Sequence, residues 1–198
     1  KKGTPTMGGL FIVFGTLVGY TFSHINFWTI GEGFKVELTS ININVFFIFG
    51  LALLMALVGF IDDFLKVKAG RNLGLTPSQK FLLQFLVGLL SAYYFNYLDY
   101  DSKFYFFSGL GIEVGIIKWL IVIFFIIGIT NSVNFTDGLD GLVAGSSAIS
   151  FGGILIISFW IYRHPEYYIK FIGQDFLTVE ISLLISAVAG ACLGFLWW

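Results

Sequence analysis

The sequence predicts an all-α, polytopic transmembrane helix bundle, and two observations lead to this class. Hydrophobic residues make up 57% of the 198 residues and charged residues only 12%, whereas a soluble domain carries roughly 25% charge. The apolar residues also fall into blocks of about 20, the length that an α-helix needs to cross a bilayer. The net charge of −1 gives no indication of a nucleic-acid partner.

The first three apolar blocks predict spanning helices over residues 8–27, 44–61 and 81–98. The first block follows a segment rich in lysine, threonine and glycine. The second ends at a pair of aspartates, because a carboxylate is costly within the bilayer. The third follows the segment 76–79 (Thr-Pro-Ser-Gln), which predicts a capping box with proline as the first helical residue.

The last three blocks predict spans over residues 115–130, 142–162 and 176–198. Glycines four residues apart are typical of closely packed membrane helices, and such pairs occur at Gly15/Gly19, Gly141/Gly145 and Gly190/Gly194. The single cysteine, Cys192, is expected to be a small buried core residue. His24 and His164 are expected to be ordinary interfacial residues without a catalytic role.

Consecutive spans alternate in direction, so the loops alternate between the two sides of the membrane. Residues 1–9, 62–80 and 131–141 then share one side. The basic residues of that side are concentrated in the short loop 62–80, which favours a cytoplasmic location. We therefore expect the three polar segments to face the cytoplasm and to contribute to one site.

The second span is followed by Asp62, Asp63 and Lys66. On a helix, this lysine neighbours both carboxylates. Two carboxylates beside a lysine suit a phosphate–metal complex, and a solvated helix end with a structural ion pair is the alternative. Lys80 falls in the first turn of the third helix, where a basic residue opposes the helix dipole. It could bind an anion or serve as an ordinary cytoplasmic basic residue.

The segment 131–141 concentrates amide and carboxylate oxygens beside two glycines. Such oxygens are hard ligands that suit Mg²⁺ better than zinc, and glycine permits backbone conformations closed to other residues. The residues concerned are Asn131, Asn134, Asp137, Gly138, Asp140 and Gly141.

Three segments together resemble the signature segments of the phospho-N-acetylmuramoyl-pentapeptide transferases, a family of polyprenyl-phosphate N-acetylhexosamine-1-phosphate transferases. They are residues 1–9 (KKGTPTMGG), 62–66 (DDFLK) and 131–141 (NSVNFTDGLDG). Phe135 departs from the leucine that is more common in the family. The later family motifs, an acidic segment and a histidine-rich loop, are not found in these 198 residues.

The resemblance implies an enzyme of the bacterial inner membrane with about ten spanning helices. This chain would supply the second to seventh spans, as one integral-membrane domain over residues 1–198 that is truncated at both ends. The implied reaction transfers phospho-N-acetylmuramoyl-pentapeptide from UDP to undecaprenyl phosphate and releases UMP. The implied partners are UDP-N-acetylmuramoyl-pentapeptide, undecaprenyl phosphate and the lipid bilayer, and a homodimer is a candidate assembly. We expect the fragment alone to be inactive.

The resemblance also implies roles for individual residues. Asp62 and Asp63 would be the catalytic carboxylates, and Asn131 would be a ligand of Mg²⁺. Asn134, Gly138 and Gly141 would support the loop. The implied substrate contacts are Lys1, Thr6, Lys66, Lys80, Asp137 and Asp140. A single displacement is preferred over a covalent aspartyl-phosphate intermediate, and both mechanisms remain open.

Two other functions are considered. A sister transferase that uses UDP-N-acetylglucosamine is disfavoured by the Thr-Pro-Thr-Met run at residues 4–7 and by the Thr-Asp pair at 136–137. An ion-coupled transporter would place carboxylates near the centres of its spans. The four aspartates of the motifs lie at span ends instead.

Overall fold

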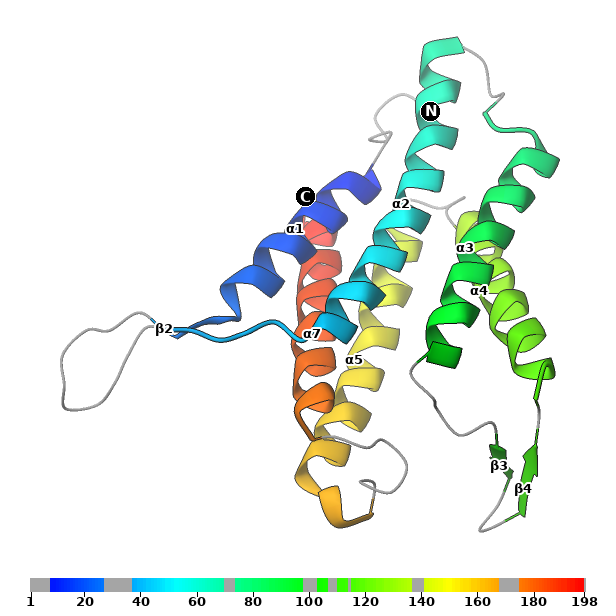
Figure 1. The fold of residues 1–198 in the computed structure, drawn as a ribbon. Coiled ribbons are helices and arrows are strands. Elements are labelled where there is room, and N and C mark those ends of the chain that lie inside the picture. The colour runs from blue at the N-terminus through cyan, green and yellow to red at the C-terminus, as the bar shows by residue number, and fades with distance from the viewer. Residues whose placement is uncertain are drawn as a thin grey trace. The chain divides into compact units, whose positions relative to one another are not determined.

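The computed structural model describes residues 8–26, 37–69, 74–97, 103–106, 110–113, 115–136, 141–167 and 175–197 (Figure 1). The chain divides into two compact units. The first contains Lys1–Gly50 and Leu139–Trp198, and the second contains Leu51–Gly138. Because the helix α2 (Ile43–Ala69) begins in the first unit and ends in the second, it belongs to both.

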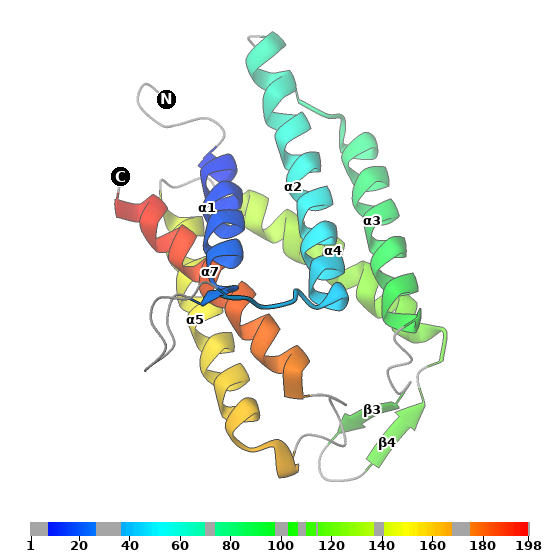
Figure 2. The same ribbon diagram turned by 60° about the vertical axis from the view of Figure 1, so that its left-hand side comes forward.

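The first unit is built around α7 (Asp175–Trp197), which packs against both α1 (Gly8–Phe22) and α5 (Leu142–Arg163). Figure 2 shows α7, in orange and red, beside the blue α1 and the yellow α5. The buried core of this unit joins side chains from α1, the start of α2 and α7. Its members are Tyr20, Val45, Phe49 and Leu184.

Small residues bring α1 close to α7. A Cβ atom added to Gly15 would lie 3.1 Å from the Cβ of Ala191, and one added to Gly19 would lie 3.3 Å from the Cβ of Ala187. The close packing predicted for this glycine pair is therefore confirmed. Cys192 is buried, as predicted. Gly190 and Gly194 differ, because an added Cβ there would meet no atom of the described residues within 4 Å.

The second unit contains the rest of α2, α3 (Pro77–Tyr97) and α4 (Ile117–Thr136). α3 packs against α4, and a Cβ atom added to Gly88 would lie 3.3 Å from the Cα of Ile123. Glycine thus permits a close approach of these two helices. An apolar cavity of about 220 Å³ is lined by residues of all three helices, among them Met55, Ser91 and Thr130.

Two short antiparallel ladders, which the sequence did not predict, lie in connections between helices. In the first unit, β1 (Ile25–Asn26) pairs with β2 (Glu37–Leu38). In the second, β3 (Lys103–Phe106) pairs with β4 (Leu110–Glu113). Neither ladder changes the helical character of the fold.

The predicted all-α membrane fold is confirmed. Among the described helices, α2, α4, α5 and α7 are long and apolar enough to cross a membrane. The shorter α1 is also apolar, whereas α3 includes more polar residues. Spanning by α1 and α3 therefore stays a prediction.

Several predicted boundaries were wrong. The first helix ends at Phe22 rather than at residue 27, whereas α2 continues to Ala69 and α4 to Thr136. The acidic pair with its lysine, and the residues 131–136, are therefore helical rather than parts of loops. The 27 residues of α2 span about 40 Å at 1.5 Å per residue, and the hydrocarbon core is about 30 Å thick. The helix is thus long enough to carry its charged last turns beyond the hydrocarbon.

Candidate functional site

The C-terminal turns of α2 hold an ion-pair cluster of two carboxylates and one ammonium group. The Nζ of Lys66 lies 2.6 Å from Oδ2 of Asp62 and 3.2 Å from Oδ1 of Asp63. Spacings of four and three residues place these side chains on one helix face, as the sequence predicted. The side chains of Asp63 and Lys66 are 46% and 38% exposed, whereas that of Asp62 is only 10% exposed.

Asp62 also connects α2 with the segment that leads into α3. Its Oδ1 accepts a hydrogen bond of 2.8 Å from the backbone N–H of Leu75. A Cβ atom on Gly74 would overlap the Asp62 carboxylate, so the backbone approaches this closely only because residue 74 is glycine. Both oxygens of Asp62 are thus engaged within the protein. Asp63 is the more accessible carboxylate of the pair.

The start of α3 follows the predicted capping box. The backbone N–H of Gln79 donates to Oγ1 of Thr76 over 3.3 Å, and the N–H of Thr76 donates to Oε1 of Gln79 over 3.0 Å. This arrangement satisfies two N–H groups at the helix end. It fixes the first turn of α3, which carries Lys80.

Asn131 lies near the end of α4 and pairs with a glutamine of α3. Its Nδ2 donates to Oε1 of Gln84 over 3.0 Å and to the carbonyl oxygen of Ile127 over 2.8 Å. Gln84 is 2% exposed. Sequence reasoning missed Gln84, because a glutamine within an apolar block gives no sign of its partner 47 residues away.

The structure places the remaining predicted residues as follows. Asn134 is exposed on the last turns of α4. Gly141 precedes α5 with a φ of 76°, a left-handed conformation that favours glycine. Five predicted residues lie outside the described part of the chain: Lys1, Thr6, Asp137, Gly138 and Asp140.

The described residues fit a divalent metal only in part. Among them, no group of three or more His, Cys, Asp or Glu side chains is placed to hold a metal ion. Asn131 carries no charge, both hydrogens of its Nδ2 are used, and its Oδ1 lies 3.5 Å from Nε2 of Gln84. A metal bound here would require charged ligands from residues beyond those described.

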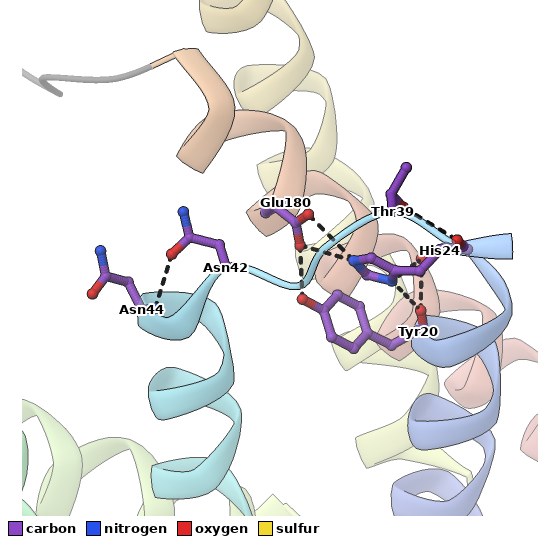
Figure 3. Close-up of polar contacts among 7 residues, drawn as sticks. Tyr20, His24, Thr39, Asn42, Asn44 and Glu180 are labelled. Carbon is purple, nitrogen blue, oxygen red and sulfur yellow. Dashed lines mark hydrogen bonds and ion pairs between the residues drawn. The ribbon is translucent and has the colours of Figure 1, made fainter. Parts of the chain in front are cut away.

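Figure 3 shows a second polar cluster, in the first unit, that sequence reasoning missed. Oη of Tyr20 donates to Oε2 of Glu180 over 2.8 Å, and Nε2 of His24 lies 3.1 Å from the same oxygen. Nδ1 of His24 lies 2.8 Å from the carbonyl oxygen of Tyr20. All three residues are buried, so His24 is enclosed by the protein, and its location at the membrane interface stays a prediction.

The two ring nitrogens of His24 join α1 to α7, because Nδ1 contacts the carbonyl oxygen of Tyr20 and Nε2 contacts both carboxylate oxygens of Glu180. The signal that could have revealed the cluster is Glu180 itself, because a carboxylate within an apolar span requires a partner.

The fold and the site define a multi-pass membrane protein whose second unit presents paired carboxylates, lysines and an oriented amide. The sequence model of glycosyl transferase family 4 matches residues 45–198. The chain belongs to this family. A signature described as "Phospho-N-acetylmuramoyl-pentapeptide-transferase signature 1" matches residues 1–13.

Curated relatives cover the whole chain. Two proteins named phospho-N-acetylmuramoyl-pentapeptide-transferase are each 38% identical to this chain. The one from Nocardia farcinica aligns over 212 residues and the one from Frankia casuarinae over 216. One from Salinispora arenicola is 35% identical over 220 residues. The alignments include 100% of this chain and 57%, 56% and 59% of the respective relatives. The chain thus spans a little over half the length of the relatives that it matches.

Proposed function

We propose that the complete protein containing this chain transfers phospho-N-acetylmuramoyl-pentapeptide from UDP to undecaprenyl phosphate. The observation that carries this proposal is the signature match over residues 1–13, together with the names of relatives that align along the whole chain. The product would be the first lipid-linked intermediate of peptidoglycan synthesis. The sister reaction with UDP-N-acetylglucosamine is not favoured by the signature.

The proposed reaction is one displacement at phosphorus. An oxygen of the lipid phosphate attacks the β-phosphorus of the UDP-linked substrate. The bond from that phosphorus to the bridging oxygen breaks, and UMP leaves with the bridging oxygen. A phosphate monoester is largely ionised at neutral pH, so the attack does not require a strong general base. Positioning and charge stabilisation then carry most of the catalysis.

The second unit offers residues for these tasks. Lys66 is partly exposed and is held by two carboxylates, which supports a role in contacting the diphosphate. Lys80, in the fixed first turn of α3, is the second candidate contact. Asp63 is accessible enough to meet a substrate directly, whereas Asp62 orients Lys66 from its buried position. Lys1, Thr6, Asp137 and Asp140 are proposed to line the nucleotide pocket.

We further propose that the enzyme uses Mg²⁺. When bound, the metal would spread the charge that develops on the diphosphate. Asn131 would contribute its amide oxygen, and charged ligands would come from residues beyond those described. We also propose a bacterial inner-membrane location with the site on the cytoplasmic face, and a homodimer as a candidate assembly.

The direct test compares two proteins purified in detergent: the complete protein and the 198-residue chain. Formation of lipid-linked muramoyl-pentapeptide and release of UMP are measured with Mg²⁺, with EDTA, and with Mg²⁺ restored after EDTA. We expect the complete protein to be active and EDTA to abolish its activity reversibly. The chain alone should be inactive, because it spans about 57% of its relatives.

Three results would contradict parts of this proposal. No product from the complete protein, together with transfer from UDP-N-acetylglucosamine, would establish the sister reaction. Full activity in EDTA would remove the metal from the mechanism. Robust activity of the 198-residue chain would show that these residues alone complete the site.

A further inference from the structure

We propose that Gly74 is a positioning residue: it lets the backbone hold the Asp62 carboxylate in place, and that carboxylate in turn holds the ammonium group of Lys66. The inference rests on the proposed function, in which Lys66 contacts the diphosphate. Gly74 belongs to none of the three signature segments. It does not touch the reacting atoms in this proposal, because it acts through Asp62.

The first step is the contact between the Asp62 carboxylate and the backbone that precedes α3. The Asp62 side chain is 10% exposed, and its Oδ1 accepts a hydrogen bond of 2.8 Å from the N–H of Leu75. A Cβ atom added to Gly74 would lie 2.8 Å from the carbonyl oxygen of Asp62 and 3.0 Å from its Cγ. Nonbonded carbon atoms normally stay about 3.5–4 Å apart, so alanine at this position would displace the backbone or the carboxylate by about 0.5–1 Å.

The second step leads from the carboxylate to the ammonium group. Nζ of Lys66 lies 2.6 Å from Oδ2 of Asp62 and 3.2 Å from Oδ1 of Asp63. An ammonium group carries three hydrogens, and these two contacts engage two of them. The backbone fixes Asp62, whereas the Asp63 side chain is 46% exposed. The position of the ammonium group therefore depends on Asp62, and its third hydrogen can meet a diphosphate oxygen.

The same backbone segment also leads directly into the capped first turn of α3. Leu75, which donates to Asp62, is followed by the N-cap residue Thr76. The carbonyl oxygen of Thr76 accepts the N–H of Lys80 over 2.9 Å. The contact with Asp62 thus sets the spacing between the end of α2, which carries Lys66, and the turn of α3 that carries Lys80. These are the two lysines proposed to contact the diphosphate.

Three variants disturb this contact in different ways. Gly74→Ala introduces the Cβ atom, Leu75→Pro removes the N–H donor and keeps the glycine, and Asp62→Ala removes the acceptor. Gly59→Ala is the matched control, because a Cβ atom added to Gly59 in α2 would meet no described atom within 4 Å. Helix content and unfolding of each variant show whether the protein is folded.

The first measurement is the rate at which an amine-reactive ester acylates Lys66 in the complete protein in detergent, without substrates. Mass spectrometry quantifies the product, and Lys68, which is exposed near the same end of α2, is the internal reference. An ammonium group must lose a proton before it reacts, so the contact with Asp62 slows the labelling of Lys66. We expect all three variants, but not the control, to raise the labelling ratio about 2- to 5-fold, which corresponds to the loss of one partly exposed ion pair. The double variant Gly74→Ala/Asp62→Ala should label Lys66 no faster than Asp62→Ala does.

The second measurement is UMP release by the same proteins, with kcat and KM for the UDP-linked substrate determined separately. A misplacement of about 1 Å can cost about 100-fold in rate, so we expect kcat/KM to fall about 100-fold in Gly74→Ala and Leu75→Pro. KM should rise, because Lys66 is proposed to contact the diphosphate. A smaller folded fraction would lower kcat and leave KM unchanged.

The outcomes separate this inference from the function on which it rests. Unchanged labelling of Lys66 in the folded variants would overturn it, and so would faster labelling with normal turnover. Faster labelling in the double variant than in Asp62→Ala would also overturn it, because Gly74 would then act independently of Asp62. If Gly74→Ala does not fold, Leu75→Pro decides between the same outcomes. Faster labelling in the variants, with no lipid-linked product from the unsubstituted complete protein, would overturn the proposed function and leave the positioning of Lys66 intact.

Discussion

Two substitutions of Asp62 should distinguish the contributions of its hydrogen bond with Leu75 and its ion pair with Lys66. Asparagine can preserve the hydrogen bond, whereas alanine preserves neither contact. In Asp62→Asn, the side-chain carbonyl can still accept the N–H of Leu75, but the neutral amide cannot form an ion pair with Lys66. A hydrogen bond to a charged group contributes about 1.5–3 kcal/mol and a neutral one about 0.5–1.5 kcal/mol. The ion pair with the partly exposed Lys66 contributes about 0.2–1 kcal/mol. Asp62→Ala should therefore cost about 2–4 kcal/mol of unfolding free energy, and Asp62→Asn about 1–2 kcal/mol.

The assay is reversible unfolding of the complete protein in mixed detergent micelles, with helix content as the signal and Asp63→Asn as the matched control. The side chain of Asp63 is 46% exposed and pairs with Lys66 at the helix surface, so this variant should change stability by at most about 1 kcal/mol. Equal losses for Asp62→Asn and Asp62→Ala would refute the contact with Leu75. Both Asp62 variants should also lose most UMP release, and near-normal turnover by a folded variant would remove Asp62 from the mechanism.

Three further predictions concern stability. Glu180→Ala leaves a buried histidine and tyrosine without their shared partner and should cost about 3–5 kcal/mol in the same unfolding assay; a loss below about 1 kcal/mol would contradict the buried pair. Gly88→Val places a branched side chain against Ile123 and should cost about 1–3 kcal/mol of unfolding free energy. Gly50→Val is its control, because an added Cβ at that position meets no described atom within 4 Å. Thr76→Ala removes the cap of α3 and should cost about 1 kcal/mol, whereas an unchanged stability would show that the contact with Gln79 is not formed in solution.

Much of the fold could be predicted from the sequence, because the bilayer imposes a simple rule on composition and length. The helix ends were harder to predict. Hydropathy places the end of a span at its first charged residue. The backbone hydrogen bonds of the helix can continue beyond that residue, because charged side chains there can pair with each other. In α2, the pairing of Lys66 with both aspartates supports the additional turns. The two ladders depend on pairing between separate segments, which periodicity does not reveal.

The candidate site was predictable where its contacts are local. The ion pairs of Lys66 and the capping box at Thr76 join residues three or four apart, so spacing alone predicted them. The contact of Asn131 with Gln84 joins residues 47 apart, and that of Glu180 with His24 joins residues 156 apart. A single sequence contains no signal for such pairs beyond the cost of burying a polar group without a partner.

That cost also explains why these polar residues define particular helix contacts. In lipid, contact with another apolar helix stabilises an apolar side chain little more than contact with lipid does. Close packing and interhelical hydrogen bonds therefore determine which helices associate. Among the described residues, every buried side-chain nitrogen or oxygen has a hydrogen-bond partner. The hydrogen bond between Gln84 and Asn131 joins α3 to α4, and the one between Glu180 and Tyr20 joins α7 to α1. Each of these hydrogen bonds therefore specifies the partner of its helix within one unit of the chain.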